Sequence, residues 1–422
     1  MSFVVLLATA LSFFFSIPAN AQLLDELLPD LDIPVIGSIL NTATRTLQLP
    51  SSPARAASRI SSVVGSEPTD STIFEVATNL VKAGLTLDNL QDAVDFVDGF
   101  VDGQDSSSNV NSRSPNPPVY PVSGKTDARY SLPAGAPQPI ILVPGTGNTG
   151  YTTFKGNYIP LLQRSTIGDP VWLNIPDFLL DDAQVNAEFV AYAINYISGI
   201  SRKRKAAVIC WSQGNIDTQW AFKYWPSTRT RSRTFSPDYH STTLANLIDN
   251  GDPMPPAVLQ QEYNSDFITT LRANGGDSSY VPTTTVYSGF LDEIVQPQSG
   301  HGASAFLKNA RGAGVSNNEV QVICPPGSPA GSFYTHEGTL YNPLGFALAI
   351  DALSHAGPGR PNRLDLDDVC APLLTPGLDV TDFLLTENSI LIAALTILTY
   401  PDRVLNEPPI KGIYHLQAYV HV

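Results

Sequence analysis

The chain has 422 residues, of which 43% are hydrophobic and 15% charged, a composition that supports a sizeable core and excludes a disordered chain. This length fits one large domain with extensions, or two domains. The net charge of −15 repels nucleic acid and anionic lipid headgroups, so neither is expected as a partner, whereas a neutral substrate such as an ester is compatible.

The first 21 residues have the pattern of a secretory signal peptide. An uncharged apolar run over residues 3–17 ends in Ala19-Asn20-Ala21, a small-x-small cleavage pattern that precedes Gln22. A membrane anchor is the alternative, but the run is shorter than the roughly 20 apolar residues that span a bilayer. We therefore expect a secreted, extracellular protein without a stable membrane anchor.

Residues 22–120 differ from the rest of the chain. They are rich in acidic residues, contain an amphipathic pattern over residues 87–101, and end in a linker of Ser, Asn and Pro. We expect a helical N-terminal extension. It is interpreted as a pro-region, a cap over an active site or a solubilising arm, and the first two are favoured.

From residue 121 onward the sequence predicts one large domain, in which strands and helices alternate from residue 139. Apolar or β-branched runs predict strands, and periodic apolar positions predict helices. The predicted strands cover residues 139–143, 206–210, 283–287 and 320–324, and the clearest helices cover 184–197 and 216–225. This alternation is typical of an α/β fold with a mostly parallel sheet flanked by helices.

The sharpest local signal is a serine between a predicted strand and a predicted helix, in the sequence Cys210-Trp211-Ser212-Gln213-Gly214. A nucleophile elbow needs such a tight turn, which lifts the serine hydroxyl above the sheet. Glycine is present two residues after Ser212 but not two before it, and Cys210 is small enough to replace it. An ordinary strand-to-helix turn is the alternative interpretation.

A serine nucleophile needs a base, and in α/β-hydrolases the order along the chain is serine, acid, histidine. Asp292 follows the predicted strand at 283–287, and His336 lies in a polar loop after the one at 320–324. Taken alone, a histidine is more commonly a surface or core residue than a catalytic one, and an aspartate in a loop is more commonly a solvated charge. Their joint order makes Ser212, Asp292 and His336 the candidate triad.

Stabilising an oxyanion requires backbone N–H groups near the serine. One is expected from Gln213, and the other from the loop Pro144-Gly145-Thr146-Gly147 that follows the first strand. The loop lacks the residues that would continue a phosphate-binding motif, which disfavours that alternative.

The chain has three cysteines, so two can pair in an oxidising compartment. Cys210 ends a buried strand, which makes Cys324 and Cys370 the better pair. No Cys-x-x-Cys motif is present, and neither a metal nor another cofactor is predicted.

Several ordered motifs resemble the family of secreted fungal lipases related to Candida antarctica lipase B. The similarity extends over most of residues 137–372. It is carried by residues 139–147, 157–161, 182–186, 211–214, 236–239, 281–284 and 292–298, and by His336.

The resemblance implies an α/β-hydrolase fold and an esterase mechanism without a cofactor. Ser212 would be the nucleophile, Asp292 the acid and His336 the base, with Thr146 and Gln213 as oxyanion donors. Trp211, Asp238 and Asn148 would line the substrate pocket, and Cys324 and Cys370 would form a family disulfide.

This sequence also departs from the family. Cysteines for two further disulfides are absent, and Asn215 and Asn148 replace a glycine and a threonine, respectively. The chain beyond about residue 375 matches the family poorly, although residues 391–398 are expected to form a helix near the site.

The leading functional hypothesis is a triacylglycerol lipase acting at an oil–water interface. The alternatives are a carboxylesterase or transacylase on other esters and, remotely, an inactive binding protein on the same fold.

Overall fold

The computed structural model describes residues 138–201, 204–229, 232–235, 253–289, 292, 294–325, 327–332 and 334–411. The predictions for the signal peptide at 1–21 and the extension at 22–120 lie outside these residues, as does Asp238.

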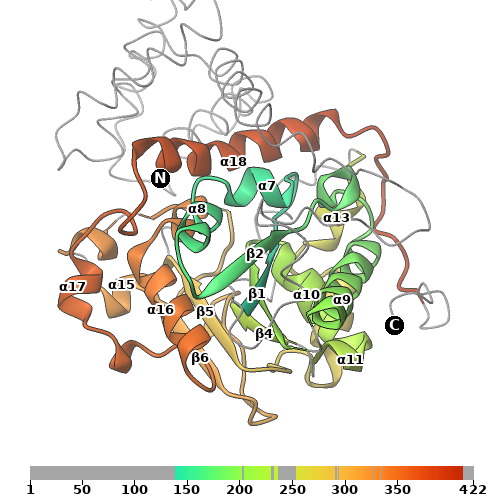
Figure 1. The fold of residues 1–422 in the computed structure, drawn as a ribbon. Coiled ribbons are helices and arrows are strands. Elements are labelled where there is room, and N and C mark those ends of the chain that lie inside the picture. Colours follow the sequence, from blue (N-terminus) through green and yellow to red (C-terminus); the bar gives the residue numbers. More distant parts are fainter. Residues whose placement is uncertain are drawn as a thin grey trace, which may run out of the picture. The chain divides into compact units, whose positions relative to one another are not determined.

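Six strands form one sheet in the order β2-β1-β3-β4-β5-β6, and each neighbouring pair is parallel (Figure 1). The strands are β1 (Gln138–Val143), β2 (Gly168–Trp172), β3 (Ala206–Cys210), β4 (Ser232–Phe235), β5 (Thr283–Tyr287) and β6 (Val315–Glu319). All residues of β3 and β5 are buried, which is typical of strands covered on both faces. The predicted strands at 139–143, 206–210 and 283–287 are confirmed.

The helices pack around this sheet. They are α7 (Gly150–Phe154), α8 (Tyr158–Gln163), α9 (Ala183–Ile200), α10 (Gly214–Tyr224), α11 (Pro226–Arg229), α13 (Pro256–Gln260), α14 (Asp266–Arg272), α15 (Val320–Ile323), α16 (Pro343–Ser354), α17 (Leu366–Cys370) and α18 (Val380–Thr399). In Figure 1 the green helices α9, α10 and α11 lie together, whereas the orange α15, α16 and α17 lie near β5 and β6. The predicted helices at 184–197 and 216–225 correspond to α9 and α10.

The predicted strand at 320–324 is wrong. The strand is β6, five residues earlier, and the chain turns into α15 at Val320. Val320 and Cys324 are buried one helical turn apart, while Val322 is 74% exposed. The alternating apolar pattern is therefore equally compatible with one helical turn, in which positions i and i+4 face the core.

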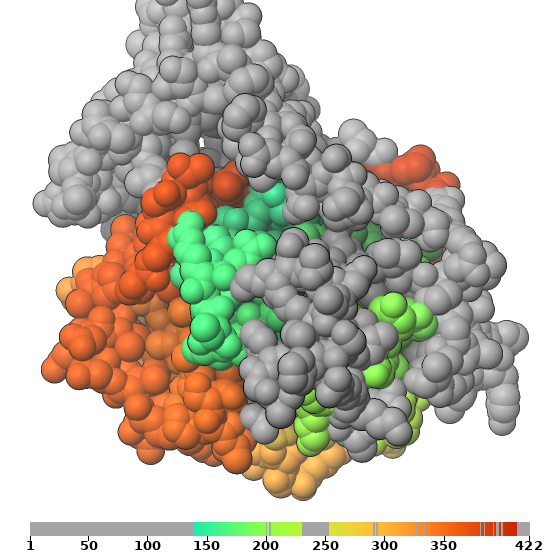
Figure 2. Space-filling view, viewed as in Figure 1, coloured from blue at the N-terminus to red at the C-terminus, as the bar shows by residue number. Residues whose placement is uncertain are grey.

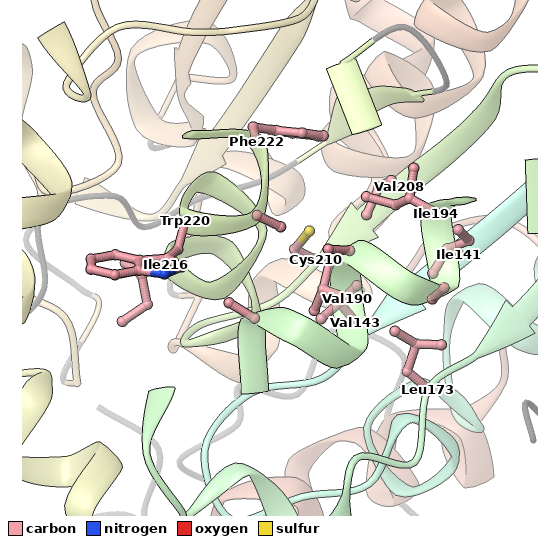
Figure 3. Close-up of a cluster of buried hydrophobic side chains, with 14 of the residues drawn as sticks. Ile141, Val143, Leu173, Val190, Ile194, Val208, Cys210, Ile216, Trp220 and Phe222 are labelled. Carbon is pink, nitrogen blue, oxygen red and sulfur yellow. The ribbon is translucent and has the colours of Figure 1, made fainter. Parts of the chain in front are cut away.

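A large apolar core lies between β1, β3 and the helices α9 and α10. Figure 3 shows its centre, where the Cys210 sulfur lies among buried aliphatic and aromatic side chains such as Val143, Val190 and Trp220. Burial raises the pKa of the Cys210 thiol to about 12, so this cysteine behaves as a small hydrophobic residue.

The helix expected at 391–398 is the second half of α18, which begins at a capping box formed by Asp379 and Asp382. It packs against α7 and against the short 3-10 helix η7 (Glu337–Leu340), far from α18 in the sequence. On the face shown in Figure 2, the green segment containing α7 and α8 adjoins the red-orange α18. Among the helices that the structure describes, none combines the length and the hydropathy needed to cross a membrane.

Candidate active site

Ser212 lies on a tight turn between β3 and α10. Its backbone φ is +52°, in the left-handed region that a non-glycine residue rarely adopts. A Cβ atom on Gly214 would lie 2.4 Å from the carbonyl oxygen of Pro144, so only glycine fits two residues after the serine. This is the strained strand-to-helix geometry of a nucleophile elbow.

His336 and Asp292 meet although 44 residues separate them. His336 Nδ1 lies 2.9 Å from Asp292 Oδ2, and both side chains are almost completely buried. The other carboxylate oxygen of Asp292 accepts the backbone N–H groups of Ile294 and Val295. These bonds fix the carboxylate, and a proton on Nδ1 leaves Nε2 as the nitrogen that can act as a base.

Trp211 connects the serine turn to the histidine loop. Its indole Nε1 donates to the carbonyl oxygen of His336 at 3.2 Å, and the two rings lie 5.0 Å apart between centroids. Because Trp211 precedes Ser212 directly, these contacts bring His336 to the serine turn. The structure thus places all three candidate triad residues at one site.

The loop after β1 packs directly on the serine turn. A Cβ atom on Gly145 would lie 2.7 Å from the Ser212 Cβ atom and equally close to the Trp211 ring. Thr146 is the next residue, so its backbone lies near Ser212, as does that of Gln213. This proximity is what the predicted oxyanion donors require.

Asn148 is fully buried and ties this loop to α18. Its amide nitrogen donates to the carbonyl oxygen of Ser389 at 2.9 Å and to that of Thr146 at 3.3 Å. Thr396, also on α18, donates to the carbonyl oxygen of Gly147 at 2.7 Å. Asn148 and Trp211 therefore lie beside the candidate site, and their pocket role stays a prediction.

The structure adds residues that the sequence did not indicate. Gln261 accepts a hydrogen bond from the Thr146 hydroxyl and donates one to the Gln213 side chain. The 3-10 turn η2 (Pro176–Leu179) supplies carbonyl oxygens to Gly147 N and to the Gln213 amide. Neither segment carries a motif, and only three-dimensional proximity identifies them.

Cys324 and Cys370 form a disulfide, with Cα atoms 5.5 Å apart. The bond joins the end of α15 to the end of α17. His336 lies within the loop that this disulfide closes. The cysteine pair expected from the sequence is thus present in the structure.

No family model matches the chain, but comparison with known proteins identifies similar proteins. Lipase B from Pseudozyma antarctica is 37% identical over 255 residues, which cover 59% of this chain and 70% of that protein. The crystal structure of Aspergillus fumigatus lipase B is similar with a TM-score of 0.67 and 42% identity, covering 90% of this chain and 99% of the other. These similarities confirm the expected resemblance and the α/β-hydrolase fold, with a parallel sheet flanked by helices.

Proposed function

This chain belongs to the lipase B family and is a carboxylic ester hydrolase, and we propose that it cleaves triacylglycerols through Ser212, His336 and Asp292. The observation that carries the proposal is the buried His336–Asp292 contact of 2.9 Å beside the strained serine turn. Strained backbone and a histidine oriented by a carboxylate are together the requirements of an activated serine.

The reaction follows from these positions. His336 Nε2 takes the proton of the Ser212 hydroxyl as the serine oxygen attacks the ester carbonyl carbon, and Asp292 stabilises the charged imidazole ring. Backbone N–H groups of Thr146 and Gln213 stabilise the oxyanion. The alcohol leaves with the proton held by His336, and water attacks the acyl-enzyme by the same route to release the acid.

We further propose that the enzyme acts outside the cell. The apolar run before Gln22 supports secretion, and the Cys324–Cys370 disulfide fits an oxidising compartment. Ester or lipid at an oil–water interface would then be the substrate.

The test compares emulsified triolein with short-chain and long-chain p-nitrophenyl esters. Ser212→Ala should lower kcat about a million-fold on every substrate that the wild type cleaves, as loss of a triad serine does. Ser299→Ala, a control in an exposed loop, should keep full activity. Cleavage of short esters but not triolein would assign the enzyme to the esterases, and an active Ser212→Ala variant would overturn the site.

A further inference from the structure

We propose that Gln261 is a positioning residue that restrains the hydroxyl proton of Thr146 and releases it only when the oxyanion forms. The inference rests on the proposed function, because it concerns the loop that would hold the oxyanion. A chain of hydrogen-bonded polar side chains, most of them buried, runs away from this loop.

Four polar side chains from three separate parts of the chain are joined end to end. The Thr146 hydroxyl donates to Gln261 Oε1 at 3.0 Å, and Gln261 Nε2 donates to Gln213 Oε1 at 3.1 Å. Gln213 Nε2 donates in turn to Asp217 Oδ2 at 3.4 Å. Gln213 and Asp217 are fully buried, and Gln261 is nearly so.

The orientation of both amide groups is fixed by backbone carbonyls. Gln261 Nε2 also donates to the carbonyl oxygen of Ala257 at 2.9 Å, and Gln213 Nε2 to that of Leu179 at 2.9 Å. Rotating either amide by 180° would turn its oxygen toward a carbonyl oxygen and lose these bonds. Gln261 therefore presents its oxygen to Thr146 and requires a donor there.

A hydroxyl group has one proton, so Thr146 cannot donate fully to both Gln261 and an oxyanion. In the structure the Thr146 hydroxyl proton is directed to Gln261. When negative charge develops on the substrate oxygen, the hydroxyl must turn toward it and leave Gln261 Oε1 without this donor. Gln261 thus reduces the net transition-state stabilisation that the Thr146 hydroxyl provides.

The size of this effect follows from the strength of the bond that is released. A neutral hydrogen bond contributes a modest net free energy, which corresponds to about two- to tenfold in rate. The effect belongs to kcat, because the hydroxyl leaves Gln261 only in the transition state.

The test is a double-mutant cycle in kcat and KM on a soluble p-nitrophenyl ester. Thr146→Val removes the hydroxyl at nearly constant volume, and Gln261→Met removes the acceptor. Any general damage caused by Gln261→Met is present with and without the hydroxyl and cancels in the comparison. We expect Thr146→Val to lower kcat about two- to tenfold more in the Gln261→Met enzyme than in the wild type.

Gln260→Met is the matched control. Gln260 is the neighbouring buried glutamine on α13, but it contacts Ala183 and Asp182 rather than Thr146. In that background Thr146→Val should have the same effect as in the wild type. Gln261→Leu replaces Gln261→Met if the methionine variant does not fold.

The outcomes separate the two proposals. An equal or smaller loss of kcat in the Gln261→Met enzyme would overturn the role of Gln261 and leave the proposed function intact. If Thr146→Val changes kcat in neither enzyme, the hydroxyl takes no part and the inference falls with it. The proposed function itself is decided separately by Ser212→Ala.

Discussion

Four non-glycine residues at the candidate site have left-handed backbone conformations: Asp177, Phe178, Leu179 and Ser212. Each such residue costs about 1–3 kcal/mol, and the surrounding structure must hold it in place. The turn at 177–179 directs the Phe178 carbonyl oxygen to Gly147 N and the Leu179 oxygen to the Gln213 amide. The strained turn therefore holds both segments that would carry the oxyanion donors.

The sequence predicted only one of these strained positions. Ser212 was identified because a strand, a serine and Gly214 form a recognisable pattern. Apart from Asp177, the turn at 177–179 contains none of the residue types that commonly adopt a left-handed conformation. Its conformation is imposed by tertiary hydrogen bonds, which leave no local signal.

Asp217 allows a prediction about stability and pH. Burial raises the pKa of this carboxyl well above its ordinary value, the hydrogen bond from Gln213 opposes the rise, and the nearby Asp182 adds to it. The folded protein thus binds the proton more tightly than the unfolded chain, so stability falls as pH rises above the unfolded pKa of about 4. Asp217→Asn should remove this loss and stabilise the protein at pH 8 by about 1 kcal/mol or more.

Urea unfolding at pH 4 and pH 8 measures this change. The gain should be much smaller at pH 4, where Asp217 is protonated in the folded protein and in about half of the unfolded chains. Asp182→Asn is the control, because Asp182 is ion-paired with Lys411 and should not gain stability on losing its charge. An equal gain for Asp217→Asn at both pH values would contradict the explanation.

At the scale of elements, the inner strands β1, β3 and β5 were predicted, whereas the inner strand β4 and the edge strands β2 and β6 were not. β3 and β5 lie inside the sheet, and their apolar or β-branched runs mark them directly. β6 has the sequence VSNNE, which carries no apolar signal. Its polar side chains are held by tertiary bonds, such as Asn318 Nδ2 to the carbonyl oxygen of Thr285 at 2.7 Å and Asn317 Nδ2 to that of Leu307 at 3.0 Å.

The disulfide links two short helices and closes a loop with a sequence separation of 46 residues. In the chain-entropy model, a loop of this length contributes about 4 kcal/mol by restricting the unfolded chain. Replacing both Cys324 and Cys370 with alanine should lower the free energy of unfolding by an amount of this order. Urea unfolding with and without dithiothreitol measures it.

Cys210→Ala serves as the control for this prediction, because Cys210 is a free buried thiol. The wild type and Cys210→Ala should both lose stability in reductant, whereas the double alanine variant should not respond. A double variant as stable as the oxidised wild type would show that the disulfide contributes little.

At the scale of the whole molecule, the C-terminal segment contacts elements that lie much earlier in the sequence. Val404 pairs with Met254 in an antiparallel bridge, and Glu407 accepts the backbone N–H groups of Asp266 and Phe267 at the start of α14. These contacts could not be inferred from the sequence, because residues beyond about 375 match the family poorly. Single polar residues in an irregular segment have no periodicity from which a distant partner can be inferred.

Lys411 makes the contact with the clearest energetic consequence. Its ammonium group lies 2.8 Å from Asp182 Oδ2, at the start of α9, and the Asp182 side chain is 7% exposed while that of Lys411 is 33% exposed. Removing the cation leaves a nearly buried carboxylate whose remaining partners, Gln184 and Gln260, are neutral. Lys411→Ala should therefore lower the free energy of unfolding by about 1–2 kcal/mol, between the values for exposed and for buried pairs.

Lys308→Ala is the matched control for this ion pair. Lys308 pairs with Asp277 at the surface, where its side chain is 65% exposed, so its loss should cost less than about 1 kcal/mol. Urea unfolding at low and high salt compares the two variants, and only the Lys308 effect should largely disappear in salt. An equally small, salt-sensitive effect for Lys411→Ala would mean that the C-terminal segment does not shield Asp182, and that α9 begins without help from the end of the chain.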